Sequence, residues 1–92
     1  MSISIEELSK KLDQRIESKI KNSYTNKLLK LGSKKIAQKF AEESSELIID
    51  YLNGSKKRTI EEAADVIYHL LVLLKSKKIK ISDIHKELSK RS

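Results

Sequence analysis

Five acidic side chains recur at helical spacing in two short stretches of the 92-residue chain. The stretches read E-E-x-x-E and E-x-x-D, and they supply Glu42, Glu43, Glu46, Glu62 and Asp65. Side chains three or four residues apart lie on one face of a helix, so each stretch presents a small carboxylate patch. Two such patches facing each other would repel strongly, and a divalent cation would relieve that repulsion. A site made only of oxygen atoms favours Mg²⁺ or Mn²⁺.

The position of Glu43 indicates that the first patch faces inward. Glu43 shares a helical face with Phe40 and Leu47, and a buried carboxylate needs an ionic partner or a metal. A short break at Asn53 and Gly54 separates the two acidic helices, so we expect them to lie antiparallel. The C-terminal half of the first helix would then face the N-terminal half of the second.

The same acids also allow a purely structural interpretation, which the spacing alone leaves open. Glu62 follows Thr59 by three residues, which is the spacing of a capping box. Acidic residues in the first turns of a helix also interact favourably with its dipole. On the preceding helix, Lys39 is spaced to pair with Glu42 and Glu43, at about 0.2–0.5 kcal/mol for each pair.

Helices must position these acids, because apolar residues recur at helical period and the chain has two glycines and no proline. We expect a helix after a capping box formed by Ser4 and Glu7, and a break at residues 22–25. Further helices are expected at residues 27–31 (closed by Gly32), 33–53 (capped by Ser33), 59 to about 77 (capped by Thr59) and 82 to about 90 (capped by Ser82). Residues 55–58 read as a basic loop without an assigned function. We therefore expect residues 1–92 to form a single all-α domain of four to five helices.

Composition excludes several classes of protein. There is no cysteine, which rules out disulfides and thiolate chemistry, and two histidines are too few for a convincing histidine zinc site. No apolar run reaches the length of a membrane span, and the N-terminus lacks the features of a signal peptide, so a cytoplasmic protein without membrane contact is expected. The net charge of +7 comes mostly from scattered lysines, which indicate solubility rather than a nucleic-acid footprint.

Further motifs surround the acids in a fixed order. S-Y-T occupies residues 23–25, K-I-A-Q-K occupies residues 35–39, and E-A-A-D-x-x-Y-H-L-L begins at residue 62. Over roughly residues 1–90 the chain resembles the phosphoribosyl-ATP pyrophosphatase family. That family belongs to the all-α nucleoside triphosphate pyrophosphohydrolase superfamily, with the MazG-type and dimeric dUTPase enzymes. The acidic pattern is common to the superfamily, whereas the other three motifs are specific to the one family.

The resemblance implies a reaction and a set of residues for it. The family hydrolyses phosphoribosyl-ATP to phosphoribosyl-AMP and pyrophosphate, the second step of histidine biosynthesis. Matched to the motif, the Mg²⁺ ligands are Glu43, Glu46, Glu62 and Asp65. Glu42 would be an outer acid or the base that orients the attacking water. The expected substrate-binding residues are Ser23, Tyr24, Thr25, Lys35 and Lys39, and the two lysines are placed to meet phosphates.

Two other functions are compatible with parts of the sequence. A house-cleaning MazG-type enzyme acting on another nucleoside triphosphate would share the acids but not the S-Y-T and K-I-A-Q-K motifs. A non-catalytic basic module that binds nucleic acid would need an arginine-rich helix or an aromatic stacking platform, and the sequence has neither. The chain is too short for the cyclohydrolase domain that some relatives carry, so we expect a separate cyclohydrolase to act on the product.

The segment 66–74 is apolar almost all round its axis, which is typical of a helix in the middle of a structure. In a lone chain some of its side chains, drawn from Tyr68, Leu71, Val72 and Leu74, would face water. We therefore expect a MazG-like helical bundle that is completed by homodimerisation, with the active sites near the subunit interface. His69, within this segment, is expected to be a core or interface residue.

Overall fold

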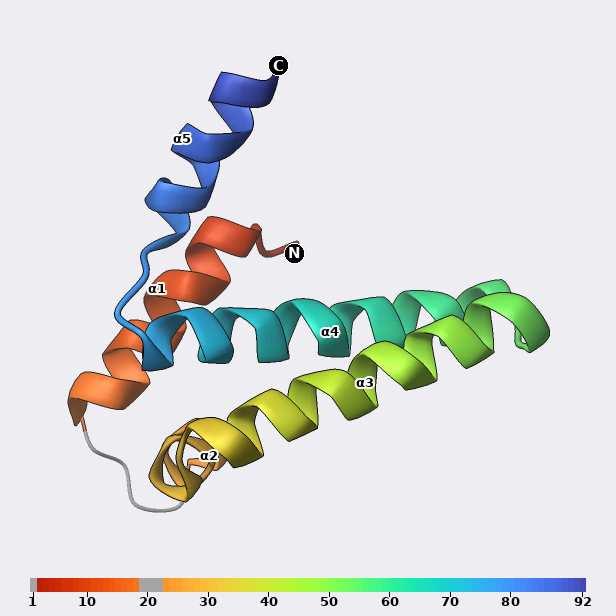
Figure 1. Cartoon of the computed structure of the whole chain (residues 1–92), viewed down its shortest axis with the longest axis horizontal. Coiled ribbons are helices and arrows are strands. Elements are labelled where there is room, and N and C mark those ends of the chain that lie inside the picture. The colour runs from red at the N-terminus through yellow and green to blue at the C-terminus, as the bar shows by residue number, and fades with distance from the viewer. Residues whose placement is uncertain (1, 19–22) are drawn as a thin grey trace.

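A computed structural model describes residues 2–18 and 23–92, and the regular structure of that part of the chain is entirely helical. The helices are α1 (Ile5–Ser18), α2 (Tyr24–Leu31), α3 (Ser33–Asn53), α4 (Lys56–Ser76) and α5 (Ile81–Arg91). Figure 1 shows α3 and α4 side by side as a long antiparallel hairpin, with α1 and α2 near the end that is opposite the α3–α4 turn. This end is called the base of the hairpin. The all-α fold is confirmed.

The start of α1 follows the expected capping box. The backbone N–H of Glu7 donates to Ser4 Oγ at 3.1 Å, and the N–H of Ser4 donates to Glu7 Oε1 at 3.3 Å. Such caps satisfy N–H groups that have no partner within the helix, and each contributes about 1 kcal/mol to stability. In the sequence, apolar residues recur at helical spacing from Ile5 to Ile20, and Ile20 lies outside the described residues.

The helix α2 is longer than predicted, because it begins at Tyr24 rather than at residue 27. Ser23 is its N-cap, and its hydroxyl accepts from the N–H of Asn26 at 3.3 Å. Gly32 ends α2 and begins α3 with φ at 91°, a conformation that favours glycine. Ser33 is therefore a residue of α3 and not its cap, which corrects the prediction.

The largest correction concerns the start of α4. Ser55 is the N-cap, with its hydroxyl accepting from the N–H of Arg58 at 3.1 Å, so the predicted basic loop is mostly helix. The capping box predicted at Thr59 is wrong, because Thr59 lies inside the helix and its hydroxyl donates to the carbonyl of Ser55 at 2.9 Å. The turn between α3 and α4 consists only of Gly54 and Ser55, and this short connection brings the cap forward by one helical turn.

The last helix, α5, also starts earlier than predicted. Lys77 ends α4, and Lys78 has a positive φ of 60° before the chain turns toward α5. The N-cap of α5 is Lys80, whose N–H donates to Asp83 Oδ2 at 3.0 Å. Ser82, the predicted cap, is the second residue of the helix. Here an aspartate three residues after the cap, rather than a serine at the cap, closes the first turn.

A small aliphatic core forms at the base of the hairpin. Four helices contribute its five buried hydrophobic side chains, which are Leu12, Leu28, Ile36, Leu71 and Val72. Lys75 joins α4 to α1 at the edge of this core, with its Nζ atom 2.8 Å from both Ser9 Oγ and Asp13 Oδ1. None of the helices in the described part of the chain has the length and hydropathy needed to cross a membrane.

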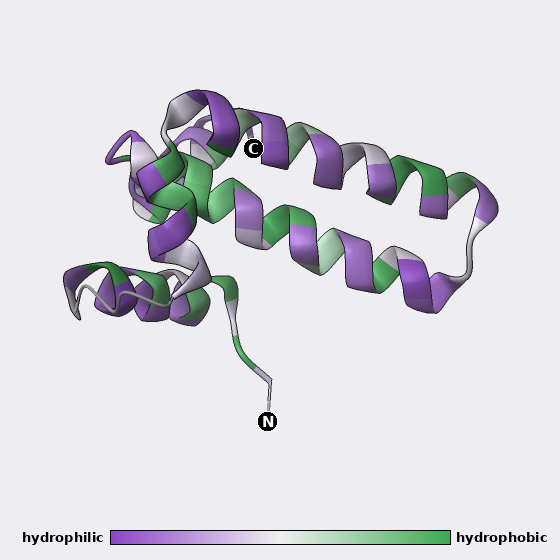
Figure 2. Ribbon diagram, turned by 90° about the horizontal axis from the view of Figure 1, so that it is seen from below, coloured by the Kyte–Doolittle hydropathy of each residue, from purple (hydrophilic) through white to green (hydrophobic). Residues whose placement is uncertain are grey.

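Apolar side chains outside this core are exposed in the part of the hairpin near the α3–α4 turn. Figure 2 shows hydrophobic residues toward that end as well as at the base. The exposed set is Ile48, Ile49, Tyr51, Leu52 and Ile60, which we call the outer apolar face. Leu71 and Val72, in the middle of α4, are buried within the single chain. The prediction that apolar side chains of this segment face water is therefore wrong for these two residues and holds only for the partly exposed residues on either side of them. Homodimerisation stays a prediction.

Candidate active site

The hairpin brings acids of α3 and α4 together. Glu43, Glu62 and Asp65 each offer one oxygen atom, and these three oxygens lie within 4.8 Å of one another. Glu43 and Glu62 are only 8% and 5% exposed, whereas Asp65 is open to solvent. Three of the four carboxylates expected to hold a metal thus converge at one point between the two helices. We call these three residues, with Glu46, the acidic cluster.

Glu46 belongs to the acidic cluster through its electrostatics. It follows Glu43 by three residues on α3 and is not one of the three converging oxygens. The negative charge of Glu43, followed by desolvation and the charge of Glu62, raises the pKa of Glu46 above its usual value. Without a cation, this carboxylate therefore holds its proton more tightly than an ordinary surface glutamate does.

Glu62 carries the observation that points most directly to a ligand. Its Oε2 atom is the one buried side-chain polar atom among the described residues that has no hydrogen-bond partner. Because α4 begins at Lys56, Glu62 is not the third residue of a capping box and Asp65 is not in the first turn. The capping interpretation therefore does not apply to Glu62, and the dipole interpretation does not apply to Asp65. A cluster of carboxylate oxygens with a free buried acceptor fits a hard divalent cation such as Mg²⁺.

Two basic side chains flank the acidic cluster. Lys39 Nζ lies 3.3 Å from Glu43 Oε1 and 3.9 Å from Glu42 Oε2, which confirms the predicted pairing. The hydrogen bond to Glu43 raises the pKa of Lys39, so its charge is held firmly at neutral pH. On α4, Arg58 Nη2 lies 2.8 Å from Glu62 Oε1. Each buried carboxylate thus has a cation one helical turn before it.

Glu42, the expected catalytic residue, lies beside the acidic cluster and not inside it. Its side chain is 51% exposed, and its Oε1 atom accepts from Gln38 Nε2 at 3.1 Å. A carboxylate in this position is open to water while its neighbour Glu43 faces the cluster. Its position therefore allows it to orient a water molecule, and its catalytic role stays a prediction.

A pocket of about 350 Å³ adjoins the acidic cluster between α2 and the first half of α3. Its lining includes four residues expected to act in binding or catalysis, namely Tyr24, Lys35, Lys39 and Glu42. Leu28 and Leu31 contribute an apolar wall. Basic groups, an aromatic ring and an apolar wall at one opening suit a ligand that is part nucleoside and part phosphate.

Tyr24 is linked to the acidic cluster through His69, which is buried on α4. The hydroxyl of Tyr24 lies 3.1 Å from His69 Nε2, and His69 Nδ1 lies 2.7 Å from the backbone carbonyl of Asp65. A carbonyl can only accept, so Nδ1 carries the proton, and in the neutral ring Nε2 accepts from Tyr24. Partial burial raises the pKa of Tyr24, and the charge of Lys39 opposes that shift. The expected role of His69 as a core residue thus includes a polar one.

The other two residues of the S-Y-T motif serve the local structure. Thr25 is buried, and its hydroxyl is hydrogen-bonded to the hydroxyl of Tyr68 across the α2–α4 contact. Ser23 caps α2. Of the three, Tyr24 alone lines the pocket, and contact of Ser23 and Thr25 with a substrate stays a prediction.

Two charged residues near the acidic cluster were not singled out from the sequence. Asp50 Oδ2 lies 3.6 Å from Arg58 Nη2, across the hairpin. Asp50 continues the spacing of Glu43 and Glu46 along α3, and Arg58 precedes Glu62 by four residues. Both spacings can be seen in the sequence. The spacing of Arg58 and Glu62 was not recognised as helical because residues 55–58 were assigned to a loop.

These features define an all-α protein with a carboxylate site on a helical hairpin and an adjoining basic pocket. The model of the phosphoribosyl-ATP pyrophosphohydrolase family matches residues 5–92. The chain belongs to this family, and it is therefore a member of a family of hydrolases.

Individual relatives agree with that assignment. The chain is 45% identical over 92 residues to the phosphoribosyl-ATP pyrophosphatase of Ignicoccus hospitalis, covering all of this chain and 90% of the relative. It is 45% identical over 87 residues to the enzyme of the same name from Clostridium novyi, covering 95% and 79%. The histidine biosynthesis bifunctional protein of Bacteroides thetaiotaomicron is 46% identical over 80 residues, and the chain covers 39% of its length.

Proposed function

We propose that this chain hydrolyses phosphoribosyl-ATP to phosphoribosyl-AMP and pyrophosphate in a Mg²⁺-dependent reaction of histidine biosynthesis. The observation that carries the proposal is the free buried oxygen of Glu62 inside a cluster of converging carboxylates. Membership of the phosphoribosyl-ATP pyrophosphohydrolase family supplies the substrate. The S-Y-T and K-I-A-Q-K motifs favour this substrate over those of related enzymes.

The acidic cluster would hold the metal through Glu43, Glu46, Glu62 and Asp65. When bound, Mg²⁺ supplies charge stabilisation for the phosphoanhydride oxygens and for the pyrophosphate that leaves. Glu43 and Glu62 act from buried positions on rigid helices, which fixes their oxygens relative to each other. A bound cation would offset the repulsion from Glu43 that raises the pKa of Glu46, and would thereby favour the ionised carboxylate.

The hydrolytic step itself needs a base, and we assign this role to Glu42. Its exposed carboxylate lies next to Glu43 in the chain and at the edge of the pocket. From there it would orient a water molecule toward a phosphorus atom of the phosphoanhydride that is cleaved, and it would accept a proton from that water. Lys39, which lines the same pocket as Glu42, would then bind a phosphate oxygen.

The pocket supports binding of the nucleotide part of the substrate. Tyr24 presents its ring and hydroxyl from the first turn of α2, and Lys35 presents its ammonium group from α3. Ser23 and Thr25 would contribute by holding the start of α2, and thereby Tyr24, in place.

We further propose that the protein acts in the cytoplasm as a homodimer, with a separate cyclohydrolase acting on phosphoribosyl-AMP. The Bacteroides relative is named a bifunctional protein, and this chain covers only 39% of its length. This supports a second activity that resides outside the matched region, which for this chain would be on a separate protein. The outer apolar face lies beside Asp50 and Arg58 on the same hairpin, which would bring a subunit interface close to the site.

The test is a pyrophosphate-release assay with Mg²⁺ and three substrates: phosphoribosyl-ATP, ATP and a mixture of deoxynucleoside triphosphates. We expect pyrophosphate to be released from phosphoribosyl-ATP and not from the other two substrates. This release should be lost when EDTA is added and in the Lys39→Ala variant. Glu87→Gln, at a surface acid on α5 that pairs only with Arg91 in the described structure, is a control for substitution far from the site and should retain activity. Release from deoxynucleoside triphosphates in place of phosphoribosyl-ATP would identify a house-cleaning enzyme instead.

A further inference from the structure

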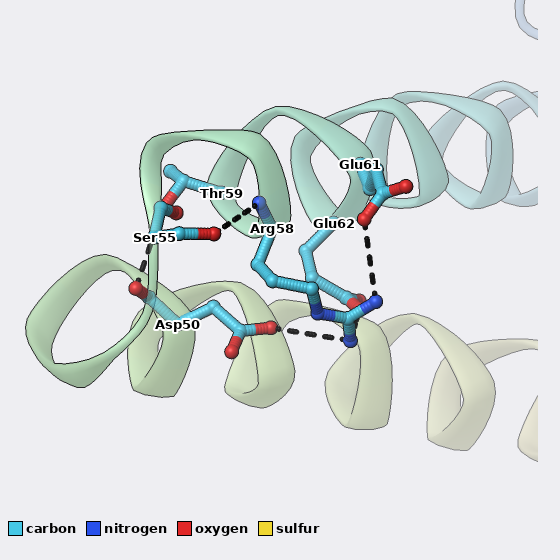
Figure 3. A network of polar contacts seen from close by, with 6 residues as sticks. All are labelled: Asp50, Ser55, Arg58, Thr59, Glu61 and Glu62. Carbon is cyan, nitrogen blue, oxygen red and sulfur yellow. Dashed lines mark hydrogen bonds and ion pairs between the residues drawn. The ribbon is translucent and has the colours of Figure 1, made fainter.

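Arg58 lies at the end of the acidic cluster that is nearer the α3–α4 turn. Its guanidinium group contacts three carboxylates, as Figure 3 shows for the residues around it. Nη2 is 2.8 Å from Glu62 Oε1 and 3.6 Å from Asp50 Oδ2, and Nη1 is 3.4 Å from Glu61 Oε1. Of the residues in these contacts, the proposed function assigns a role only to Glu62.

The backbone around Arg58 is firmly held. Ser55 Oγ accepts from the N–H of Arg58 at 3.1 Å, and Thr59 Oγ1 lies 3.3 Å from the carbonyl oxygen of Asp50, to which it donates (Figure 3). Gly54 allows the tight turn, because a Cβ atom there would lie 2.9 Å from both the carbonyl and the side-chain oxygen of Asp50. The start of α4 and the end of α3 are thus locked together, and Arg58 is directed along the hairpin.

Arg58 is the counterpart of Lys39 on the opposite helix. Lys39 precedes Glu43 by four residues and Arg58 precedes Glu62 by four, and each cation contacts its carboxylate. Because α3 and α4 run antiparallel, the two cations lie at opposite ends of the acidic cluster. A polyphosphate chain that binds a metal in the cluster can therefore meet a positive charge at each end.

A divalent cation would change the surroundings of Arg58. Arg58 holds one oxygen of Glu62, and the other oxygen has no partner. A metal held by that free oxygen would weaken the attraction of Glu62 for Arg58, while Asp50 and Glu61 would still hold the guanidinium beside the cluster. The Arg58 side chain is 55% exposed, so its N–H donors can reach a bound anion. A guanidinium group matches the geometry of phosphate oxygens.

We propose that Arg58 binds the pyrophosphate end of the substrate, while the pocket with Tyr24 and Lys35 binds the phosphoribosyl-AMP end. This orientation rests on the proposed function and follows from the arrangement of the site. The pocket adjoins the cluster at the Lys39 end, so the phosphates must extend across the cluster toward the turn. Arg58 is the cation that they meet there.

The experiment measures binding of the two products separately by calorimetry, in the presence of Mg²⁺, to the wild type, Arg58→Gln and Lys57→Gln. Lys57→Gln removes the same charge from the neighbouring position and is the matched control. We expect Arg58→Gln to weaken pyrophosphate binding at least about tenfold, the loss typical of one charged hydrogen-bonded contact. Binding of phosphoribosyl-AMP should not change, and Lys57→Gln should change neither.

Binding of Mg²⁺ alone gives a second signature. Arg58→Gln removes a cation that competes for Glu62, so Mg²⁺ should bind as tightly as to the wild type, or more tightly. Weaker Mg²⁺ binding, or equal weakening for both products, would show that Arg58 only positions Glu62 and would overturn the proposal. Unchanged pyrophosphate binding, or a loss confined to phosphoribosyl-AMP, would overturn it as well.

A variant that keeps the charge guards against a folding defect. Arg58→Lys retains the ion pair with Glu62 but lacks the fork of donors, and we expect a smaller loss that is again confined to pyrophosphate. If Arg58→Gln unfolds in circular dichroism, equal binding of pyrophosphate by Arg58→Lys and the wild type contradicts the proposal. A wild type that binds neither product contradicts the proposed function itself, which separates the two failures.

Discussion

Tyr24 and His69 are 45 residues apart in the chain, and the hydroxyl of one lies 3.1 Å from Nε2 of the other. The ring of His69 is in turn held by the carbonyl of Asp65, one of the acids in the cluster. The side chain that lines the nucleotide pocket is therefore connected, through a buried imidazole, to the helix that carries the metal ligands. Two hydrogen bonds thus connect the pocket with the cluster.

The first prediction concerns this link. His69→Phe keeps a buried ring but removes the acceptor for Tyr24, so the phenol loses its orientation and KM should rise about fivefold, the effect of one hydrogen bond of roughly 1 kcal/mol. Tyr24→Phe should produce a similar rise, with kcat little changed. Steady-state kinetics of the double variant provides the control: losses that add fully would show that the two residues act independently.

The helices were predictable from the sequence, but the first residues of α2, α4 and α5 were not. Thr59 with Glu62 satisfies the capping pattern better than Ser55 with Arg58, yet Ser55 is the cap. The deciding factor is tertiary, because a two-residue turn lets α4 pack along α3 from its first residue. Local capping preferences of about 1 kcal/mol are easily outweighed by such packing.

The site was predictable where its residues follow helical spacing within one helix. Glu43 facing inward and Lys39 pairing with it both follow from intervals of three and four. The contacts of Tyr24 with His69 and of Asp50 with Arg58 join different helices. They depend on the register between helices, which periodicity does not specify.

A second prediction tests the metal ligands. Asp65→Asn and Glu46→Gln preserve the size of the side chain but remove ligand charge, so turnover should fall by about a hundredfold or more, as expected when a metal contributes several kcal/mol. Circular dichroism should remain that of the wild type, because neither residue belongs to the hydrophobic core. Wild-type turnover in either variant would contradict the ligand assignment, and Glu87→Gln again serves as the control.

A third prediction is that Mg²⁺ stabilises the fold. A ligand that binds only the native state at 100 times its Kd adds about 2.7 kcal/mol to the free energy of unfolding. The midpoint of thermal unfolding should therefore rise with Mg²⁺ and return to its starting value with EDTA. Asp65→Asn should show a much smaller shift. A midpoint that ignores millimolar Mg²⁺, with and without nucleotide, would argue against the carboxylate site.

The fourth prediction concerns pH. The pKa of Glu46 is raised in the folded state, chiefly by Glu43, so protonation of Glu46 favours the folded state. Without metal, its contribution to stability is present below the ordinary glutamate pKa and is lost as the pH rises through that value toward the raised one. Mg²⁺ competes with this proton, so metal stabilisation should grow over the same interval.

Urea unfolding between about pH 4 and pH 7, around the ordinary glutamate value, measures this effect. The relevant quantity is the difference in unfolding free energy between the wild type and Glu46→Gln, because other carboxylates also titrate there. We expect this difference to turn against the wild type as pH rises in EDTA. A difference that is constant with pH would show that Glu46 does not sense the charge of Glu43.

The last prediction is that two copies of the chain associate through the outer apolar face. Among the residues that the structure describes, only five hydrophobic side chains are buried, while Ile48, Ile49 and Leu52 are each more than half exposed. Burial of one such side chain contributes roughly 1.5–3 kcal/mol, and a two-fold axis buries the same residues on both copies. Leu52→Lys should therefore favour the monomer and lower the unfolding midpoint, whereas Leu88→Lys, at another leucine that is more than half exposed and lies on α5, should do neither. Sedimentation equilibrium gives the answer, since a folded 10.6 kDa species of the wild type at micromolar concentration would rule out an obligate dimer.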